Sequence, residues 1–328
     1  MIAFLYPGQG TQRAGMLGVL PDSAATRRTL DEAADAIGEI DGLDTAEALA
    51  STTNAQLALL ICGVATARTL TDEHGVRPDV VAGHSVGAFA AAVAAGVLTF
   101  PEALAAVRLR GDAMAAACAS GQWGMAALTG LRLRAVGDLV KAEAAQTAAD
   151  TLWIANINAV DQVVLGGTVT ELERARQSAS SAGARRFEML DVAVASHGPR
   201  QQDTAHAMAQ HLSAIPHRDQ VAAYMTNVGA RRIRDDAAAV LDDLAAAVAH
   251  PVRWFDIMQL LPELGVVATV EMPPGDVLTR LVTATTPAMH VFNVAADGLE
   301  AITARLRSLL VDAVPEPDHR VEDLLGPT

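Results

Sequence analysis

The pentapeptide Gly83-His84-Ser85-Val86-Gly87 places a serine between two glycines, directly after a short apolar run at 80–82. The residues at 88–93 that follow are mostly strong helix formers. This order predicts a strand, a sharp turn and a helix, with the serine in the G-x-S-x-G pattern of a nucleophile elbow. The first backbone N–H groups of such a helix point at the group that the serine attacks, where they could stabilise a developing oxyanion. Because the same pentapeptide also occurs in structural turns, nucleophilic catalysis is a hypothesis at this point.

The composition limits which partners the chain can bind. It has 328 residues, enough for one large domain or two smaller ones, and a formal net charge of −14. Nucleic acids and anionic membranes attract basic surfaces, so this charge argues against both as partners. The apolar stretch 80–100 contains His84, Ser85 and several glycines, and we therefore expect buried structure there and not a membrane span.

The two cysteines, Cys62 and Cys118, lie in separate alanine-rich apolar segments. That setting favours buried small side chains in a reducing compartment over a disulfide or a catalytic thiol. No basic region precedes the apolar run at 2–5, which argues against a signal peptide. We therefore expect a cytoplasmic protein, and the sequence shows no spacing typical of metal ligands.

Short apolar runs alternate with long alanine-rich helical patterns, which predicts an α/β fold with a parallel sheet covered by helices. The strands expected in this part are 2–5, 80–82 and 266–270, and the helices are 57–69, 101–117 and one that begins at Asp276. Between 123 and 190 the pattern changes. Strands are expected there at 125–128, 152–156, 162–165 and 186–190, with helices at 135–145 and 170–182. Their β-α-β-β-α-β order is ferredoxin-like.

These elements predict a discontinuous large domain with a parallel, α/β-hydrolase-like sheet, formed by residues 1–122 and 191–312. The ferredoxin-like subdomain, 123–190, is inserted into it and returns the chain to the serine. The proline-containing segment 313–328 is predicted to be a weakly ordered tail.

Several motifs occur in one order along the chain: Pro7-Gly8-Gln9-Gly10-Thr11-Gln12, the Ser85 pentapeptide, Arg110-Gly111 and Ser196-His197. Together they resemble the malonyl-CoA:acyl-carrier-protein acyltransferases, and the likeness runs from residue 2 to about residue 310. Three further segments also look like that family: 156–164, Thr226-Asn227 and 250–254.

The resemblance implies that Ser85 is the nucleophile and that His197 is the base that takes its proton. Serine hydrolases usually orient the base with a carboxylate. In the resembled family a backbone carbonyl does this, and we align it with Ala247, where many of those enzymes have glutamine.

The resemblance also implies an oxyanion hole formed by the backbone N–H groups of Gln9 and Val86. Arg110 would bind the free carboxylate of a malonyl group through two parallel hydrogen bonds. Consecutive side chains in such a turn point in different directions. We therefore expect His84 to line the substrate pocket and not to act as the base.

Two segments, 85–91 and 270–275, resemble more closely the epsilon subunit of bacterial malonate decarboxylase. Fatty-acid enzymes commonly carry an acidic residue where this chain has Ala88. The expected function is transfer of a malonyl group from coenzyme A to the thiol of an acyl carrier protein through an acyl-serine, within a malonate decarboxylase system. Malonyl-CoA, the carrier protein and other decarboxylase subunits are then the expected partners.

Three alternatives stay open: a malonyl transferase of fatty-acid or polyketide synthesis, a serine thioesterase, and a non-catalytic scaffold subunit. A thioesterase of the α/β-hydrolase class usually has its histidine late in the chain, whereas the expected base here precedes residue 200. We expect no permanently bound cofactor, because the coenzyme A thioester is a substrate.

Overall fold

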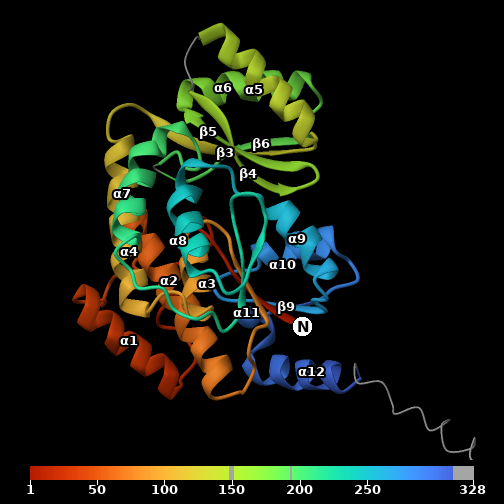
Figure 1. Cartoon of the computed structure of the whole chain (residues 1–328). Coiled ribbons are helices and arrows are strands. Elements are labelled where there is room, and N and C mark those ends of the chain that lie inside the picture. Colours follow the sequence, from red (N-terminus) through yellow and green to blue (C-terminus); the bar gives the residue numbers. More distant parts are fainter. Residues whose placement is uncertain (148–150, 193, 313–328) are drawn as a thin grey trace, which may run out of the picture.

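The computed structural model describes residues 1–147, 151–192 and 194–312, and these residues form two sheets of different size (Figure 1). The larger sheet has the strand order β10-β9-β1-β2-β7-β8. Its strands are β1 (Ile2–Tyr6), β2 (Val80–Gly83), β7 (Ala223–Met225), β8 (Arg232–Ile233), β9 (Ala268–Glu271) and β10 (His290–Asn293). Every neighbouring pair is parallel except β7 and β8. The predicted α/β class with a mainly parallel sheet is confirmed, and the predicted tail at 313–328 lies outside the described residues.

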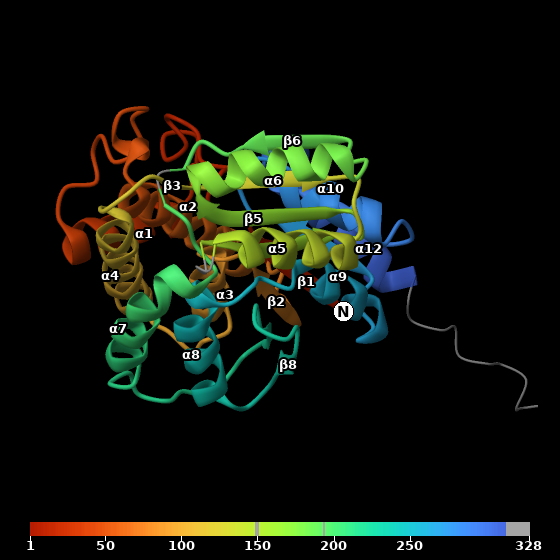
Figure 2. The same ribbon diagram turned by 90° about the horizontal axis from the view of Figure 1, so that it is seen from above.

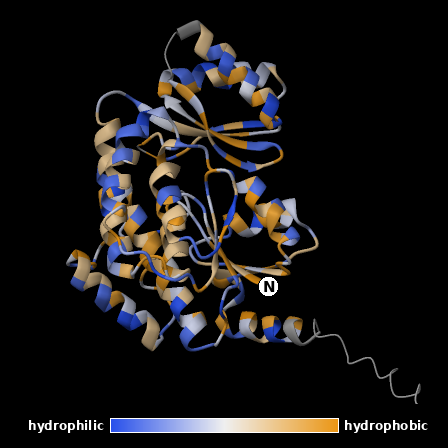
Figure 3. Cartoon of the chain, in the orientation of Figure 1, coloured by the Kyte–Doolittle hydropathy of each residue, from blue (hydrophilic) through white to orange (hydrophobic). Residues whose placement is uncertain are grey.

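Helices lie between most of the strands in the order of the chain. They are α1 (Ala24–Ile37), α2 (Thr52–Asp72), α3 (Gly87–Ala94), α4 (Phe100–Cys118), α5 (Leu133–Thr147), α6 (Val169–Ser181), α7 (Gln202–Leu212), α8 (Ala237–Ala246), α9 (Trp254–Glu263), α10 (Val277–Thr285), α11 (Val294–Asp297) and α12 (Leu299–Asp312). Hydrophilic and hydrophobic residues alternate along α1, α5 and α6 (Figure 3), which is typical of helices with one buried face.

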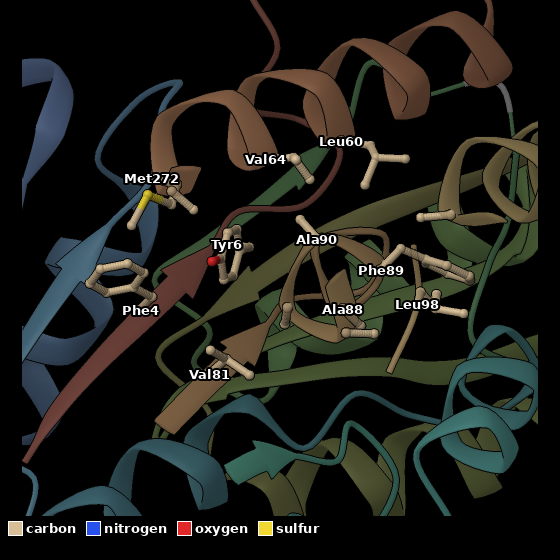
Figure 4. Close-up of a cluster of buried hydrophobic side chains, with 14 of the residues drawn as sticks. Phe4, Tyr6, Leu60, Val64, Val81, Ala88, Phe89, Ala90, Leu98 and Met272 are labelled. Atoms are coloured by element: carbon tan, nitrogen blue, oxygen red, sulfur yellow. The ribbon is translucent and has the colours of Figure 1, made fainter. Parts of the chain in front are cut away.

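Strand β1 is buried on both faces, as expected for a central parallel strand. Ile2, Phe4 and Tyr6 belong to an apolar cluster with α2, α3 and α4, and Figure 4 shows this cluster around the start of α3. Ala3 and Leu5 point to the opposite face and pack with α9 and α10. The sheet is therefore held between two helical layers.

The smaller sheet has the order β4-β5-β3-β6, and all of its neighbouring pairs are antiparallel. Its strands are β3 (Trp123–Thr129), β4 (Leu152–Ala159), β5 (Gln162–Thr168) and β6 (Arg186–Met189). Helices α5 and α6 lie side by side on its outer face (Figure 2). This is the ferredoxin-like arrangement predicted for the segment, although the domain boundaries at 123 and 190 stay predictions.

The small sheet is fastened by backbone hydrogen bonds to the segment of the large subdomain that precedes α9. The N–H of Val252 donates to the carbonyl of Ala155 at 2.9 Å, and the N–H of Ile157 donates to the carbonyl of Val252, also at 2.9 Å. Strand β4 also contacts α9 and α10. The inner edge of the small sheet is thereby fixed against the large subdomain.

Helix α4 extends one residue beyond the prediction at each end. Thr99 caps it in a reciprocal pair with Glu102, and Pro101 occupies the first turn, where a missing N–H costs nothing. The cap fixes where the helix begins and so sets which residues face inward. Arg110 is one of them.

The stretch 80–100 forms β2, the turn and α3, and no helix among the described residues is long and apolar enough to cross a membrane. Cys62 and Cys118 are both buried and neither forms a disulfide.

The two glycines of the pentapeptide are required by close backbone contacts. A Cβ on Gly87 would lie 2.2 Å from the carbonyl oxygen of Tyr6, at the end of β1. A Cβ on Gly83 would lie 2.1 Å from the amide nitrogen of Ala88. The turn therefore packs directly on neighbouring backbone.

We predict that Gly87→Ala lowers the free energy of unfolding by about 1–3 kcal/mol, because the added methyl group overpacks this contact. Denaturant unfolding measures the change. The matched control is Gly137→Ala in α5, where a Cβ would meet no atom within 4 Å. That variant should be neutral or more stable by up to about 1 kcal/mol. Unchanged stability of Gly87→Ala would contradict the close packing.

Candidate active site

Ser85 lies on the turn between β2 and α3, at the carboxyl edge of the parallel sheet. Its φ of 54° lies in the left-handed region, which costs a residue with a side chain about 1–3 kcal/mol. Its N–H donates to Oδ1 of Asn227 at 2.9 Å. The strained turn is therefore tied to a segment far along the chain.

The structure brings Ser85 and His197 together although they are 112 residues apart. The Oγ of Ser85 lies 2.7 Å from Nε2 of His197. On the other side of the ring, Nδ1 lies 2.6 Å from the carbonyl oxygen of Ala247. Because a carbonyl only accepts hydrogen bonds, Nδ1 carries the proton and Nε2 presents its lone pair to Ser85. The carbonyl aligned from the sequence is thus the one that contacts the ring.

The histidine is held in place from both subdomains. Its φ is 61°, and its N–H donates to the carbonyl of Val248 at 2.7 Å. The preceding carbonyl, of Ser196, accepts from the indole N–H of Trp153 in β4 at 2.9 Å. These contacts fix the backbone that carries the ring, and the ring itself is oriented by its hydrogen bond to the carbonyl of Ala247.

Burial, and to a lesser extent the nearby cation of Arg110, together lower the pKa of His197 from 6.5 to about 3. The hydrogen bond to Ala247 acts in the opposite sense. At neutral pH the ring is uncharged, which is the form that can accept the serine proton.

Arg110 is a buried cation beside the nucleophile, with only 2% of its surface exposed. One guanidinium nitrogen donates to Oγ of Ser85 at 3.1 Å, and another donates to Oε1 of Gln56 at 2.5 Å. Burial lowers its pKa to about 10, so it stays charged at neutral pH. Within the described residues, no Asp or Glu oxygen lies within 4.0 Å of it. A buried charge without a counter-ion is costly, and an anionic substrate group would supply one.

Gln56 is a site residue that the sequence analysis missed. It is fully buried in α2 and accepts from Arg110, while its Nε2 donates to Oγ1 of Thr52 at 3.2 Å. The same hydroxyl donates to Oε1 of Gln9 at 2.9 Å. Gln56 thus links the arginine to the Gln9 loop. The sequence feature that could have identified Gln56 is that it is the single amide side chain within the apolar run 55–65.

The two backbone N–H groups expected to form the oxyanion hole are free to bind a substrate. Among the described residues, neither the N–H of Gln9 nor that of Val86 donates to another group of the protein. Gly8 permits this loop to approach, since a Cβ there would lie 2.6 Å from the carbonyl oxygen of His84. The arrangement is compatible with the predicted role, which stays a proposal.

His84 points away from the reacting pair. Its Nε2 lies 3.0 Å from Oδ1 of Asn158, and its ring packs edge-on against Trp254 with 5.4 Å between centroids. Burial lowers its pKa below the ordinary value. It lines the cleft, as expected, and its contacts favour a role in shaping the pocket.

A cleft of about 420 Å³ opens above Ser85 between the two subdomains. The large subdomain contributes Gly8, Gln9, Ser85 and His197, and the small sheet contributes Met125, Asn156, Asn158 and Gln162, among other residues. The described parts of the chain contain no group of three or more His, Cys, Asp or Glu side chains placed to hold a metal ion.

We predict that the imidazole of His197 stays neutral as the pH falls through 6.5 and is protonated only near pH 3. NMR of protein labelled with ¹⁵N-histidine would show the Nδ1–H tautomer unchanged from pH 7.5 to 5. In Arg110→Gln the pKa of His197 should rise, because the neighbouring positive charge is gone. A protonation step near 6.5 in the wild type would contradict the assigned environment.

Comparison with known proteins gives the family. A family model described as "Acyl transferase domain" matches residues 3–301. The chain is 34% identical over 286 residues to the malonyl CoA-acyl carrier protein transacylase of Salmonella typhimurium, covering 85% of this chain and 91% of that protein. It is 35% identical over 289 residues to the transacylase of Bacillus subtilis, covering 86% and 89%.

Solved structures of malonyl transferases are also similar to this chain. An acyl-carrier-protein S-malonyltransferase from Burkholderia pseudomallei superposes with a TM-score of 0.86 at 33% identity, covering 92% of this chain and 99% of that one. A malonyl-transacylase solved in complex with a type II polyketide-synthase acyl-carrier protein gives 0.87 at 30% identity, covering 93% and 99%. With the serine and the histidine lining one cleft and the buried arginine hydrogen-bonded to the serine, the chain belongs to the acyl transferase domain family.

Proposed function

We propose that this protein is a malonyl-CoA:acyl-carrier-protein transacylase that works through an ester on Ser85. The observation that carries the proposal is the buried guanidinium of Arg110, which lies 3.1 Å from Oγ of Ser85 and has no carboxylate partner in the described parts of the chain. It provides a counter-ion for the second carboxylate of malonate at the point where the thioester must react. The similarity to malonyl transacylases over most of the chain supports the same activity.

The first half-reaction esterifies the serine. His197 Nε2 takes the Oγ proton of Ser85 as the oxygen attacks the thioester carbonyl. The carbonyl electrons move to oxygen, and the N–H groups of Gln9 and Val86 stabilise that charge. When the intermediate collapses, the carbon–sulfur bond breaks and the imidazolium returns its proton to the coenzyme A sulfur. The products are malonyl-Ser85 and free coenzyme A.

The second half-reaction reverses these steps with another thiol. His197 takes the proton from the pantetheine thiol of the carrier protein, and the sulfur attacks the ester carbonyl. The carbon–oxygen bond to Ser85 then breaks, and the imidazolium returns the proton to Oγ. One thioester has replaced another, so the exchange needs no external energy source.

Arg110 would select the acyl group by charge. Its planar guanidinium can bind a carboxylate through two parallel N–H···O bonds, which a lysine cannot reproduce. An acetyl group would leave the buried cation unpaired, at a cost of about 2–5 kcal/mol. A dicarboxylic thioester is therefore preferred over a simple acyl thioester.

We predict that Arg110→Ala lowers the malonyl-over-acetyl preference by about 30-fold or more, the equivalent of at least about 2 kcal/mol. The measurement compares kcat/KM for acyl transfer from malonyl-CoA and from acetyl-CoA to a carrier protein. Arg108→Ala is the matched control, since that arginine is exposed on the same helix. Ser85→Ala should abolish transfer. An unchanged preference in Arg110→Ala would refute the assignment of the carboxylate site, and release of free malonate in place of transfer would indicate a thioesterase.

For the physiological setting, we propose a malonate decarboxylase system. The segments 85–91 and 270–275, which resemble the epsilon subunit, support this. Ala88 is buried in the apolar cluster beneath the turn, so the chain presents no carboxylate there. Fatty-acid or polyketide synthesis is the alternative, which the named relatives support equally.

The two settings differ in the carrier. We predict that kcat/KM is about 10-fold or more higher for a carrier with the modified prosthetic group of malonate decarboxylase than for one with plain phosphopantetheine, a difference of about 1.4 kcal/mol. Assays that vary the concentration of each carrier at one fixed malonyl-CoA concentration measure this. A preference for the plain carrier would instead place the enzyme in fatty-acid or polyketide synthesis.

A further inference from the structure

The turn that carries Ser85 is held from outside by one amide side chain. Oδ1 of Asn227 accepts the N–H of Ser85 at 2.9 Å, and Nδ2 of the same residue donates to the carbonyl of Gly83, also at 2.9 Å. The amide therefore spans the turn and holds the backbone on both sides of His84. Since the N–H of Ser85 is used in this way, it is unavailable to an oxyanion.

Asn227 is in turn fixed by a buried carboxylate on α8. Oδ2 of Asp243 accepts the N–H of Asn227 and the hydroxyl of Tyr224, each at 2.9 Å. Oδ1 of Asp243 accepts the N–H of Val228 at 2.9 Å. Within the described residues Asp243 forms no ion pair, and two of these hydrogen bonds fix the segment that follows β7 while the third holds Tyr224 within β7.

The same short stretch of chain also orients the base. Helix α8 ends at Ala246, and the next residue, Ala247, accepts the Nδ1–H of His197. Asp243 lies one helical turn earlier. A single rigid segment therefore reaches the nucleophile through Asn227 and the base through a carbonyl.

We propose that Asp243 is a positioning residue for catalysis: through Asn227 it holds the Ser85 turn in the left-handed conformation that points Oγ at Nε2 of His197. The inference rests on the proposed acyl-serine chemistry. Asp243 touches neither substrate nor reacting atoms, so its loss acts on the rate of acylation and not on the binding of malonyl-CoA. A displacement of about 1 Å between reacting groups can cost about 100-fold in rate.

The test is single-turnover acylation of the full chain by malonyl-CoA, followed by intact-mass spectrometry. The amplitude reports the fraction of folded, competent protein, and the rate constant reports the geometry of the turn. Asp243→Asn keeps the size of the side chain but replaces one of its two accepting oxygens by an NH₂ group, which then opposes either the N–H of Val228 or the N–H of Asn227 and the hydroxyl of Tyr224. It should acylate to full amplitude at a rate about 10- to 100-fold below wild type. The affinity for malonyl-CoA, measured in the Ser85→Ala background, should change less than about twofold.

Two controls separate positioning from general stability. Asp242→Asn removes an exposed carboxylate one residue away and should leave the rate unchanged. Tyr224→Phe removes the third donor to Asp243 but leaves both backbone contacts, so it should lower the melting temperature with a rate within about threefold of wild type. If Asp243→Asn does not fold, Asn227→Ala decides, because it removes both contacts to the turn and should show the same slow, full-amplitude acylation.

Either Asp243→Asn or Asn227→Ala acylating at the wild-type rate would overturn the inference. Equal losses of rate in Asp243→Asn and Tyr224→Phe would also overturn it, since stability alone would then explain both. Wild-type protein that takes up no malonyl group would instead refute the proposed function. In that case the reaction of Ser85 with a sulfonyl fluoride, compared across the same variants, still tests the positioning.

Discussion

The site depends on a positive charge held out of water beside a neutral base. The guanidinium of Arg110 donates to the oxygen of Ser85, and within the described residues it has no carboxylate partner. That charge also helps to keep His197 unprotonated. A malonyl carboxylate that pairs with Arg110 would weaken this effect, so the substrate itself would make the histidine a stronger base. Burial of the charge therefore links substrate choice to reactivity.

The rest of the fold keeps this group in place. Helix α2 supplies Gln56, which joins Arg110 to the Gln9 loop. The small sheet supplies Trp153, which holds the backbone before His197. Helix α8 and the residue after it connect to both the nucleophile and the base. Each element reaches the cleft from a different part of the chain, which explains why the catalytic pair can be so far apart in sequence.

Much of this could be predicted from the sequence because it is local. The elbow, the capped helix that carries Arg110, and the ferredoxin-like order all follow from short patterns of glycine, proline and apolar residues. The contacts of Gln56, Asn227 and Asp243 could not be predicted, since each joins segments remote in sequence. Asp243 sits among alanines and leucines next to a second, exposed aspartate, and composition alone does not distinguish the two. Asp243 can hold the segment around Asn227 because it is the buried one of the two.

The most direct test of the central claim is to incubate the protein briefly with malonyl-CoA, quench it in acid, digest it and locate the modification by tandem mass spectrometry. We predict one malonyl ester, on Ser85, which disappears when an acyl carrier protein with a free pantetheine thiol is added before the quench. A malonyl group on another residue, or none at all in folded protein, would contradict the account.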